Sequence, residues 1–325
     1  MDDINKIRDN TQVTLKDLND RYAIPFKLRF VALDASQDSL ISADITNPHA
    51  TASICLQGGH VLNWQPASSS EPVIWMSTDA QFAVGKSIRG GIPVCWPWFG
   101  AHASDGKSPE NALPAHGFAR TQPWQVKGSR SLSDGSTEIS LTMPLTQTLQ
   151  AMWPHQTQLD MLINVGKTLK IALITRNLGA TDFVITEALH TYFAVSSVEQ
   201  IEVNGLHGSH FHDKAAGWIE GDQAGAILFG QEVDRVYINT PGRCTIVDTG
   251  FKRNIHIAKL GSQSTVVWNP WAVRAAQMGD LGQGDNNDGW KHFVCVESAN
   301  ALGNAVTVPA GKSHTLAVEY RVEML

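Results

Sequence analysis

The fold class can be inferred first from residues 157–175, TQLDMLINVGKTLKIALIT. Residues 159–165 and 168–175 are rich in Leu, Ile and Val, and the pair Gly166-Lys167 stands between them. Two apolar runs separated by two residues, one of them glycine, are typical of a β-hairpin with a tight turn. The stretch therefore predicts two antiparallel strands, with a positive φ at Gly166.

The same sequence pattern continues on both sides of this hairpin. Short runs of Val, Ile, Phe and Trp alternate with Gly, Asn, Asp, Ser and Pro, and few windows could form a long helix. Strands at this density indicate an all-β sandwich or barrel. Because no fixed-period repeat or linker-like run divides the chain, we expect one domain over residues 26–325. Residues 1–25 are expected to form an N-terminal arm that is partly helical or loosely ordered, and a turn is expected at residues 285–289.

Composition limits the class of ligand. The 325 residues carry a net charge of −6, and only 17% of them are charged, against roughly 25% in an average soluble domain. Nucleic acids and anionic membranes require clustered Lys and Arg, so neither is expected as a partner. An anionic ligand must then be bound by a few local cations.

The cysteines and the N-terminus indicate the compartment. Four widely spaced cysteines form no CxxC motif, which argues against a zinc site or a redox pair and favours buried free thiols in a reducing compartment. The first ten residues carry charges of both signs without the apolar run of a signal peptide, and no window of about 18 apolar residues could span a bilayer. We expect a cytoplasmic protein.

Residues 87–100, SIRGGIPVCWPWFG, are expected to form a loop with a fixed, irregular backbone. Two glycines, two prolines and three large aromatic residues within this stretch exclude a regular helix. Arg89 opens the loop, and Arg120 closes a related segment, LPAHGFAR, at residues 113–120. Two guanidinium groups on rigid backbone suit an oxyanion, because each donates paired hydrogen bonds and never loses its charge. The spacing alone equally fits two surface arginines.

His190 is a candidate acid. In residues 186–193, TEALHTYF, a strand period of two places His190 and Tyr192 on one face and Thr191 and Phe193 on the other. An imidazole titrates near neutral pH and can deliver a proton to a leaving oxygen. The alternative is a half-buried histidine with a purely structural hydrogen bond.

Glu297 is a candidate base. It follows four apolar residues, 293–296, and so ends a strand that we expect to be buried on both faces. If its side chain is desolvated, its pKa rises and the carboxylate becomes a better base. At the rim of the sheet it would instead be an ordinary solvated glutamate.

A histidine cluster allows a second kind of site. His207, His210 and His212 could hold a metal ion, as in metal-dependent sugar-phosphate isomerases, although a glycine-rich loop favours a solvated cluster. The chain has no GxGxxG or GxxxxGK[ST] motif for a nucleotide and no GxSxG motif for a catalytic serine.

Six motifs in one order give the chain a family resemblance. It resembles the D-hexose-6-phosphate mutarotases (glucose-6-phosphate 1-epimerases) of the aldose 1-epimerase superfamily over nearly all of its length outside the arm. The motifs are Ile88-Arg89-Gly90-Gly91-Ile92-Pro93 with Trp96-Pro97 and Phe99-Gly100, His116-Gly117-Phe118-Ala119-Arg120, Leu189-His190-Thr191-Tyr192-Phe193, Val233-Asp234-Arg235-Val236-Tyr237, Trp268-Asn269-Pro270 and Phe293-Val294-Cys295-Val296-Glu297.

The resemblance implies a fold, a reaction and two catalytic residues. The fold is a large antiparallel β-sandwich of the galactose mutarotase type. The reaction is the interconversion of the α and β anomers of an aldohexose 6-phosphate, with glucose 6-phosphate as the expected substrate. By motif, His190 is the catalytic acid and Glu297 the catalytic base. The reaction needs no cofactor and no metal, and we expect a monomer.

The resemblance also implies substrate contacts. Sugar and phosphate contacts fall on Arg89, Arg120 and Asp234. Ala115 stands where some relatives have a glutamine that contacts the substrate, so His116 is a candidate for that contact. Four aromatic residues are candidates for apolar walls against the sugar: Trp96, Trp98, Phe99 and Trp271. The alternatives are a non-catalytic carbohydrate-binding β-sandwich and the metal-dependent isomerase described above.

Overall fold

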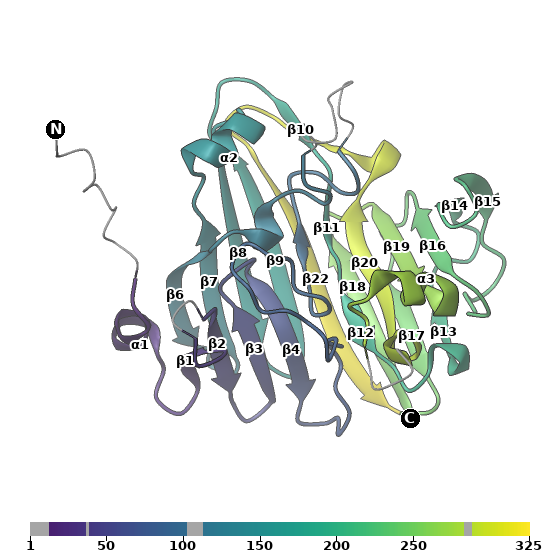
Figure 1. Ribbon diagram of the computed structural model, residues 1–325, viewed down its shortest axis with the longest axis horizontal. Coiled ribbons are helices and arrows are strands. Elements are labelled where there is room, and N and C mark those ends of the chain that lie inside the picture. The colour runs from purple at the N-terminus through teal and green to yellow at the C-terminus, as the bar shows by residue number, and fades with distance from the viewer. Residues whose placement is uncertain (1–12, 37–38, 103–112, 283–287) are drawn as a thin grey trace.

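The computed structural model describes residues 13–36, 39–102, 113–282 and 288–325. Most of the regular structure in these residues is strand, and every paired strand runs antiparallel to its neighbour (Figure 1). The all-β, antiparallel prediction is confirmed.

One long sheet spans the width of the molecule in Figure 1. Its eight strands follow one another in the order β13 (Ile201–Asn204), β17 (Cys244–Asp248), β18 (Arg253–Leu260), β22 (Ser313–Met324), β9 (Thr168–Asn177), β8 (Thr157–Val165), β7 (Thr137–Met143) and β6 (Gln125–Ser131). Because strands from residues 125–177 and from residues 201–324 share this sheet, we propose that residues 26–325 form one domain.

Three smaller groups of strands complete the architecture. A four-stranded sheet contains β1 (Leu28–Ala32), β2 (Ile41–Thr46), β3 (Ala50–Cys55) and β4 (His60–Pro66). A second eight-stranded sheet, called here the site sheet, contains β15 (Ile219–Asp222), β14 (His210–Asp213), β16 (Val233–Tyr237), β19 (Ser264–Asn269), β20 (Phe293–Asn300), β11 (Glu187–Leu189) and β5 (Val94–Cys95), with β12 (Tyr192–Ala194) also paired to β20. A two-stranded pair contains β10 (Phe183–Ile185) and β21 (Val306–Val308).

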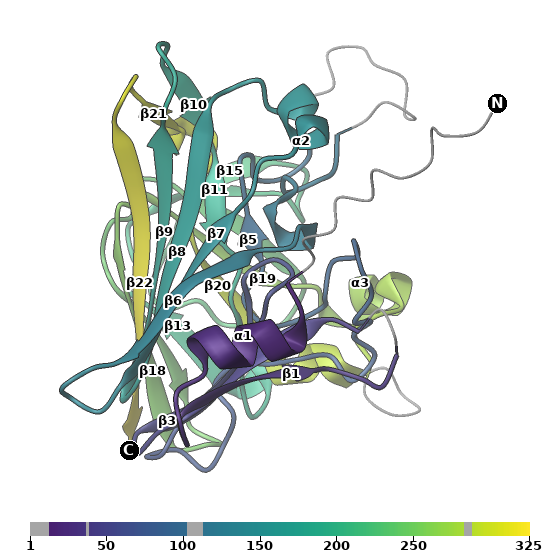
Figure 2. The ribbon, with the colours of Figure 1, turned by 90° about the vertical axis from the view of Figure 1, so that its left-hand side faces the viewer.

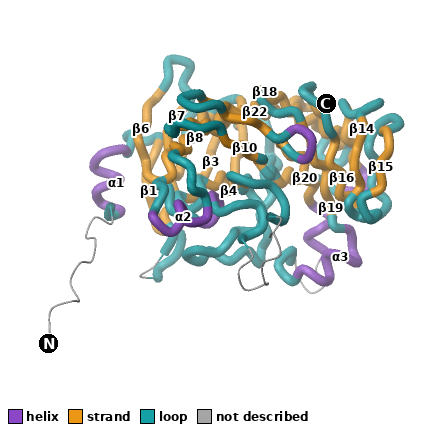
Figure 3. Tube along the Cα trace, turned by 90° about the horizontal axis from the view of Figure 1, so that it is seen from above, coloured by secondary structure: helices purple, strands orange, loops and turns teal. Residues whose placement is uncertain are grey.

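The four-stranded sheet and the site sheet lie over the two halves of the long sheet (Figures 1 and 2). β3 contacts β8 on one half, and β20 contacts β22 on the other. The helices are short: α1 (Leu15–Tyr22), α2 (Gln147–Met152), α3 (Trp271–Met278) and the 3-10 turns η2 (Ala119–Thr121), η3 (Val198–Gln200), η4 (Asp288–His292) and η5 (Leu302–Asn304). Figure 3 shows α1 and α3 at opposite ends of the layered strands.

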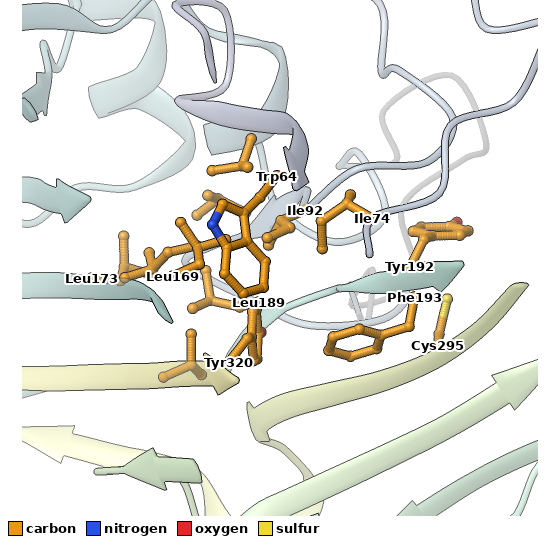
Figure 4. Close-up of a cluster of buried hydrophobic side chains, with 14 of the residues drawn as sticks. Trp64, Ile74, Ile92, Leu169, Leu173, Leu189, Tyr192, Phe193, Cys295 and Tyr320 are labelled. Atoms are coloured by element: carbon orange, nitrogen blue, oxygen red, sulfur yellow. The ribbon is translucent and has the colours of Figure 1, made fainter. Parts of the chain in front are cut away.

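The main core lies between these layers. Trp64 of β4 is fully buried, and Figure 4 shows it reaching toward Leu169, Leu189 and Tyr320, which come from β9, β11 and β22. Burying a side chain of this size contributes roughly 1.5–3 kcal/mol, so this contact binds three sheets together.

The hairpin predicted from residues 157–175 forms, with Val165 opposite Leu169. The prediction of a positive φ at Gly166 is wrong, because Gly166 keeps a negative or extended φ and donates its N–H to the carbonyl of Thr168 (3.0 Å). Glycine is required there for space instead, since a Cβ would lie 2.9 Å from Cβ of Ser136.

The described part of the N-terminal arm is a capped helix. The side chain of Thr14 accepts from the N–H of Asp17, and the carboxylate of Asp17 accepts from the N–H of Thr14. Asn19 of α1 bonds both the N–H and the C=O of Phe30 in β1 (2.9 Å each), so the helix covers the open edge of the four-stranded sheet. The expected arm over residues 1–12 and most of the turn expected at 285–289 lie outside the described residues.

All four cysteines, Cys55, Cys95, Cys244 and Cys295, are buried free thiols, as predicted. No helix in the described residues is long and apolar enough to cross a lipid bilayer.

Candidate functional site

His190 lies where the chain leaves β11 and enters β12. Its N–H donates to the carbonyl of Pro93 (3.0 Å), and the N–H of Tyr192 donates to the carbonyl of Gly91 (3.0 Å). The loop at residues 87–100 thus runs beside His190 like a neighbouring strand. Gly91 has a φ of +69°, and a Cβ there would lie 2.2 Å from Nε2 of His60, so only glycine fits at this point.

The two faces of this segment are those that the sequence predicts. Thr191 and Phe193 face the long sheet, where the Thr191 hydroxyl bonds the Tyr320 hydroxyl (2.6 Å) and the Phe193 ring packs against the Tyr320 ring. His190 and Tyr192 face the other way, with their rings stacked at 5.0 Å and 16°. Figure 4 shows Tyr192 and Phe193 on opposite sides of β12.

Glu297 reaches the same face from β20. It stands opposite Val266 in β19, and Cys295, two residues earlier, stands opposite Tyr192. Side chains two residues apart on a strand, or directly opposite on its neighbour, share a face. The surrounding positions belong to a small apolar cluster: Cys95, Ala188, Val236, Val266, Ala299 and Ala301, with Phe99 packed against it. The Glu297 side chain is only 1% exposed.

The predicted acid and base are in direct contact. Nε2 of His190 lies 3.2 Å from Oε1 of Glu297. The remaining atoms, Nδ1 of His190 and Oε2 of Glu297, are buried and have no hydrogen-bond partner in the described part of the chain. Unsatisfied polar atoms in a protein interior are costly, so these two atoms are free to bond a ligand that enters the site.

Both groups favour their uncharged forms. Burial lowers the pKa of His190 well below 6.5, and the nearby positive charges of Arg120 and Arg89 lower it further. Burial also raises the pKa of Glu297 well above 4.5. A neutral imidazole beside a protonated carboxyl holds the same number of protons as an imidazolium beside a carboxylate. The pair therefore holds one proton that either partner can carry.

Asp234 and Lys214 act on Glu297. Burial is the largest cause of the raised pKa of Glu297, and the negative charge of Asp234 raises it further. The positive charge of Lys214 lowers this pKa. Nζ of Lys214 lies 3.2 Å from Oδ2 of Asp234, with side-chain exposures of 55% and 17%. No motif marks Lys214, because its position depends on how β14 pairs with β16.

Arg89 is held by two partners. Its Nε donates to Oδ2 of Asp280 (3.0 Å), an oxygen that also forms an ion pair with Nη2 (2.9 Å), and its Nη1 donates to the hydroxyl of Tyr192 (2.9 Å). The side chain is 25% exposed. Within the described residues, N–H groups of Nη1 and Nη2 thus remain for a ligand.

Arg120 is less constrained. It lies in η2, and its Nη2 donates to the carbonyl of Ala115 (2.9 Å). Among the described carboxylates, none forms an ion pair with Arg120. Its charge therefore has no direct partner in this part of the structure and is available to an anion.

His116 lies among the cations. Its ring meets the His190 ring edge-on at 5.8 Å, and its Nδ1 accepts from the N–H of Gly100 (3.4 Å). Burial, followed by the charges of Arg120, Lys214 and Arg89, lowers the pKa of His116 to about 3. A neutral imidazole that accepts at Nδ1 carries its proton on Nε2, which can donate.

The aromatic residues divide between the site and the core. Trp96 is fully buried, and its indole N–H donates to the hydroxyl of Thr175 in the core rather than lining the site. Trp271 packs against Trp290. Phe99 packs against His116, and Trp268, which was not among the predicted walls, meets the rings of His190 and Tyr192 edge-on at 6.0 and 5.9 Å.

Two of the predicted metal ligands lie on a strand of the site sheet, and His212 stands opposite Val236 of β16. His210 and His212 lie on β14 and contact Glu220 and Asp222 of β15. Within the described residues, no three His, Cys, Asp or Glu side chains are grouped as a metal site requires. A hollow of about 760 Å³ lies on the outer face of the four-stranded sheet, lined by residues that include Arg29, Asp44 and Asn63, and no predicted site residue lines it.

Comparison with known proteins gives consistent matches. The family model described as aldose 1-epimerase matches residues 42–321. A protein of Escherichia coli K12 named "Putative glucose-6-phosphate 1-epimerase" is 40% identical over 268 residues, which are 81% of this chain and 84% of that protein. A crystal structure from Salmonella typhimurium, described as a "putative mutarotase", is 33% identical with a TM-score of 0.82 and covers 94% of this chain and 96% of its own.

A more distant structure bears on the fold alone. The crystal structure of a galactose mutarotase-like protein from Lactobacillus casei is 14% identical, with a TM-score of 0.66, and it covers 87% of this chain and 100% of its own. The predicted galactose mutarotase-like architecture is confirmed.

Proposed function

Because the chain belongs to the aldose 1-epimerase family, we propose that it interconverts the α and β anomers of an aldohexose 6-phosphate, with glucose 6-phosphate as the first substrate to test. The observation that carries this proposal is the contact between His190 and Glu297. In a pyranose, the anomeric hydroxyl and the ring oxygen are both bonded to C1. An acid and a base that serve these two oxygens must therefore be neighbours.

The proposed reaction moves two protons and breaks one bond. Glu297 takes the proton of the C1 hydroxyl while His190 gives a proton to the ring oxygen, the bond from C1 to that oxygen breaks, and a free aldehyde forms. Rotation about the C1–C2 bond presents the other face, and reclosure returns both protons. Each proton transfer contributes roughly 10²- to 10⁴-fold to the rate.

The substrate charge can set the position of the shared proton. Without a ligand, burial and the nearby cations disfavour a charged His190. A bound phosphate dianion would offset Arg89 and Arg120 and thereby favour the imidazolium that the reaction needs. We propose that the free N–H groups of Arg120 and Arg89 bind the phosphate, while Asp234 and Nε2 of His116 bind sugar hydroxyls.

The pKa directions predict the pH dependence of the turnover. We expect kcat for glucose 6-phosphate to stay within about twofold between roughly pH 6.5 and 8. The pair gains a second proton only below the lowered pKa of His190 and loses its one proton only above the raised pKa of Glu297. Initial rates at saturating substrate, corrected for the spontaneous reaction, measure this profile.

If the pKa of Glu297 lay below that of His190, the pH profile of kcat would be different. An ionised Glu297 and a protonated His190 with the ordinary values of 4.5 and 6.5 would confine activity to the interval between them. A maximum near pH 5.5 with a tenfold loss for each pH unit above about 6.5 would therefore contradict the uncharged resting pair.

Lys214 should add to the binding of the phosphate. We expect Lys214→Met to raise KM for glucose 6-phosphate by about three- to fivefold, because an exposed ammonium contributes up to about 1 kcal/mol. KM for glucose should not change. Lys170→Met is the matched control, since Lys170 is 56% exposed and pairs with Glu319 at 3.7 Å on the long sheet. An equal effect of both substitutions on KM would show that Lys214 does not contribute to phosphate binding.

The function itself can be tested with freshly dissolved α-glucose 6-phosphate. The protein should speed the approach to the anomeric equilibrium above the buffer rate, and a metal chelator should not change that rate. Activity that the chelator abolishes would favour the metal-dependent alternative at His207, His210 and His212. Binding of the sugar phosphate without acceleration would favour a non-catalytic carbohydrate-binding protein.

We also propose a cytoplasmic location and a monomeric state. The four buried free thiols support a reducing compartment. Gel filtration of the purified protein tests the monomer.

A further inference from the structure

Tyr192 connects two parts of the site. Its hydroxyl accepts from Nη1 of Arg89 (2.9 Å), and its ring stacks on the imidazole of His190 (5.0 Å, 16°). Two tryptophans also hold the Tyr192 ring in place, since it stacks on Trp75 (5.8 Å, 21°) and meets Trp268 edge-on. The residue is 2% exposed, so the hydroxyl is shielded from solvent.

Arg89 is anchored at its far side. Oδ2 of Asp280 accepts from Nε of Arg89 and forms an ion pair with Nη2, and the backbone carbonyl of Asp280 accepts from the hydroxyl of Ser77 (2.7 Å). The carboxylate thus holds the guanidinium with Nη1 directed at Tyr192. A continuous set of contacts runs from Asp280 through Arg89 and Tyr192 to His190.

We propose that Tyr192 is a positioning residue that couples phosphate binding at Arg89 to the orientation of the His190 imidazole. This inference rests on the proposed function. Arg89 has N–H donors left for the phosphate on Nη1 and Nη2, and its Nη1 also holds the Tyr192 hydroxyl. A phosphate bound by the guanidinium therefore acts on the Tyr192 hydroxyl through the same side chain, and the imidazole stacked on the tyrosine ring is held with Nε2 toward the reacting oxygen.

Tyr192→Phe separates this role from simple packing, because phenylalanine keeps the stacked ring and removes only the hydroxyl. We expect kcat for glucose 6-phosphate to fall about tenfold, the rate equivalent of one hydrogen bond to a charged group, with KM within about twofold. The kcat for glucose, which has no phosphate to transmit, should stay within about twofold.

The chain offers a matched control for this substitution. Tyr320 is also fully buried, and its hydroxyl bonds Thr191 (2.6 Å), the residue next to His190, but on the opposite face. Tyr320→Phe should leave kcat for both sugars unchanged. Asp280→Asn is a second test variant, and because this side chain is 40% exposed the substitution should not disturb the fold. It should lower kcat for glucose 6-phosphate about threefold and leave kcat for glucose unchanged.

The outcomes are distinct. A fall of kcat for the phosphorylated sugar alone supports the coupling. An equal fall for both sugars in Tyr192→Phe, or a rise of KM with kcat unchanged, overturns it. If the wild-type protein does not accelerate anomer exchange at all, the proposed function fails instead, and that result is seen before any variant is made.

Discussion

Replacing His190 by Asn or Glu297 by Gln is expected to lower the rate of anomer exchange by about 10²- to 10⁴-fold for each substitution. Each variant removes one of the two groups that share the transferable proton, so neither ring opening nor reclosure retains a complete acid and base. The variants should still bind glucose 6-phosphate, because Arg89 and Arg120 remain. Exchange rates and binding constants of the purified variants give both quantities.

Stability distinguishes a catalytic loss from unfolding. The pKa of Glu297 is raised in the folded state, so its contribution to stability is complete below the unfolded pKa near 4.5 and is lost as the pH rises through the folded value. Glutamine does not ionise. Glu297→Gln should therefore unfold at the wild-type temperature or higher, with a larger gain at pH 8 than at pH 5, and His190→Asn should stay within about 1 kcal/mol of wild type.

A second histidine–glutamate contact serves as the control. Nε2 of His314 lies 2.8 Å from Oε1 of Glu187, also with a buried carboxylate, but on the face of β11 turned toward the long sheet. His314→Asn should keep the wild-type exchange rate. Unfolded variants at His190 and Glu297, or an equal loss of activity in His314→Asn, would mean that these contacts are structural.

Arg120→Ala is expected to raise KM for glucose 6-phosphate by about ten- to a hundredfold, because one or two charge-assisted hydrogen bonds of roughly 1.5–3 kcal/mol are lost. Weak activity toward glucose should hardly change. Arg89→Ala should give a loss of similar size in KM and a further fall in kcat, since Arg89 also holds Tyr192. The quantity to compare is the ratio of kcat/KM for glucose 6-phosphate to that for glucose.

Two further variants give this comparison its controls. Arg130 lies on β6 with a 66% exposed side chain paired to Glu138, so Arg130→Ala should leave the ratio unchanged. Arg120→Lys should restore only part of the loss, because an ammonium supplies charge without the planar fork. An unchanged ratio in Arg120→Ala would make this arginine part of the scaffold and leave the phosphate preference without a source.

The sequence predicts the fold class well because strands leave a local signal. The hairpin at residues 157–175 and the alternation at residues 186–193 both fix which side chains share a face, and the structure confirms both. The geometry of a turn is harder to predict from the sequence. Gly166 was expected to need a positive φ, whereas it is required by the close approach of Ser136, a neighbour in space that no local pattern reveals.

The candidate residues also gather where the motifs place them. His190, Glu297, His116, Arg89 and Asp234 all reach one face of the site sheet or its covering loop, although they come from segments more than 200 residues apart. The roles proposed for them follow from the family motifs. Their protonation does not, because the pKa directions depend on burial that only packing creates.

The missing contacts share one cause. Asp280 and Lys214 enter the site through strand pairing or loop packing, and neither lies in a pattern that marks a ligand-binding residue. Trp268 lies in one of the family motifs, but its contact with the His190 ring depends on how β19 packs. Arg253 shows the same limit in the core: an arginine is ordinarily expected at the surface, yet this one is fully buried and donates to the carbonyls of Glu71, Pro72 and Ala194.

Saturation-transfer NMR of glucose 6-phosphate tests the central proposal most directly. When one anomeric proton signal is saturated, wild-type protein should transfer saturation to the other anomer at a rate that grows with protein concentration, and Glu297→Gln should show only the spontaneous rate. Transfer with glucose under the same conditions should be much weaker. A wild-type rate equal to that of buffer, with the phosphorylated sugar bound, would contradict the assignment of this protein as a hexose 6-phosphate mutarotase.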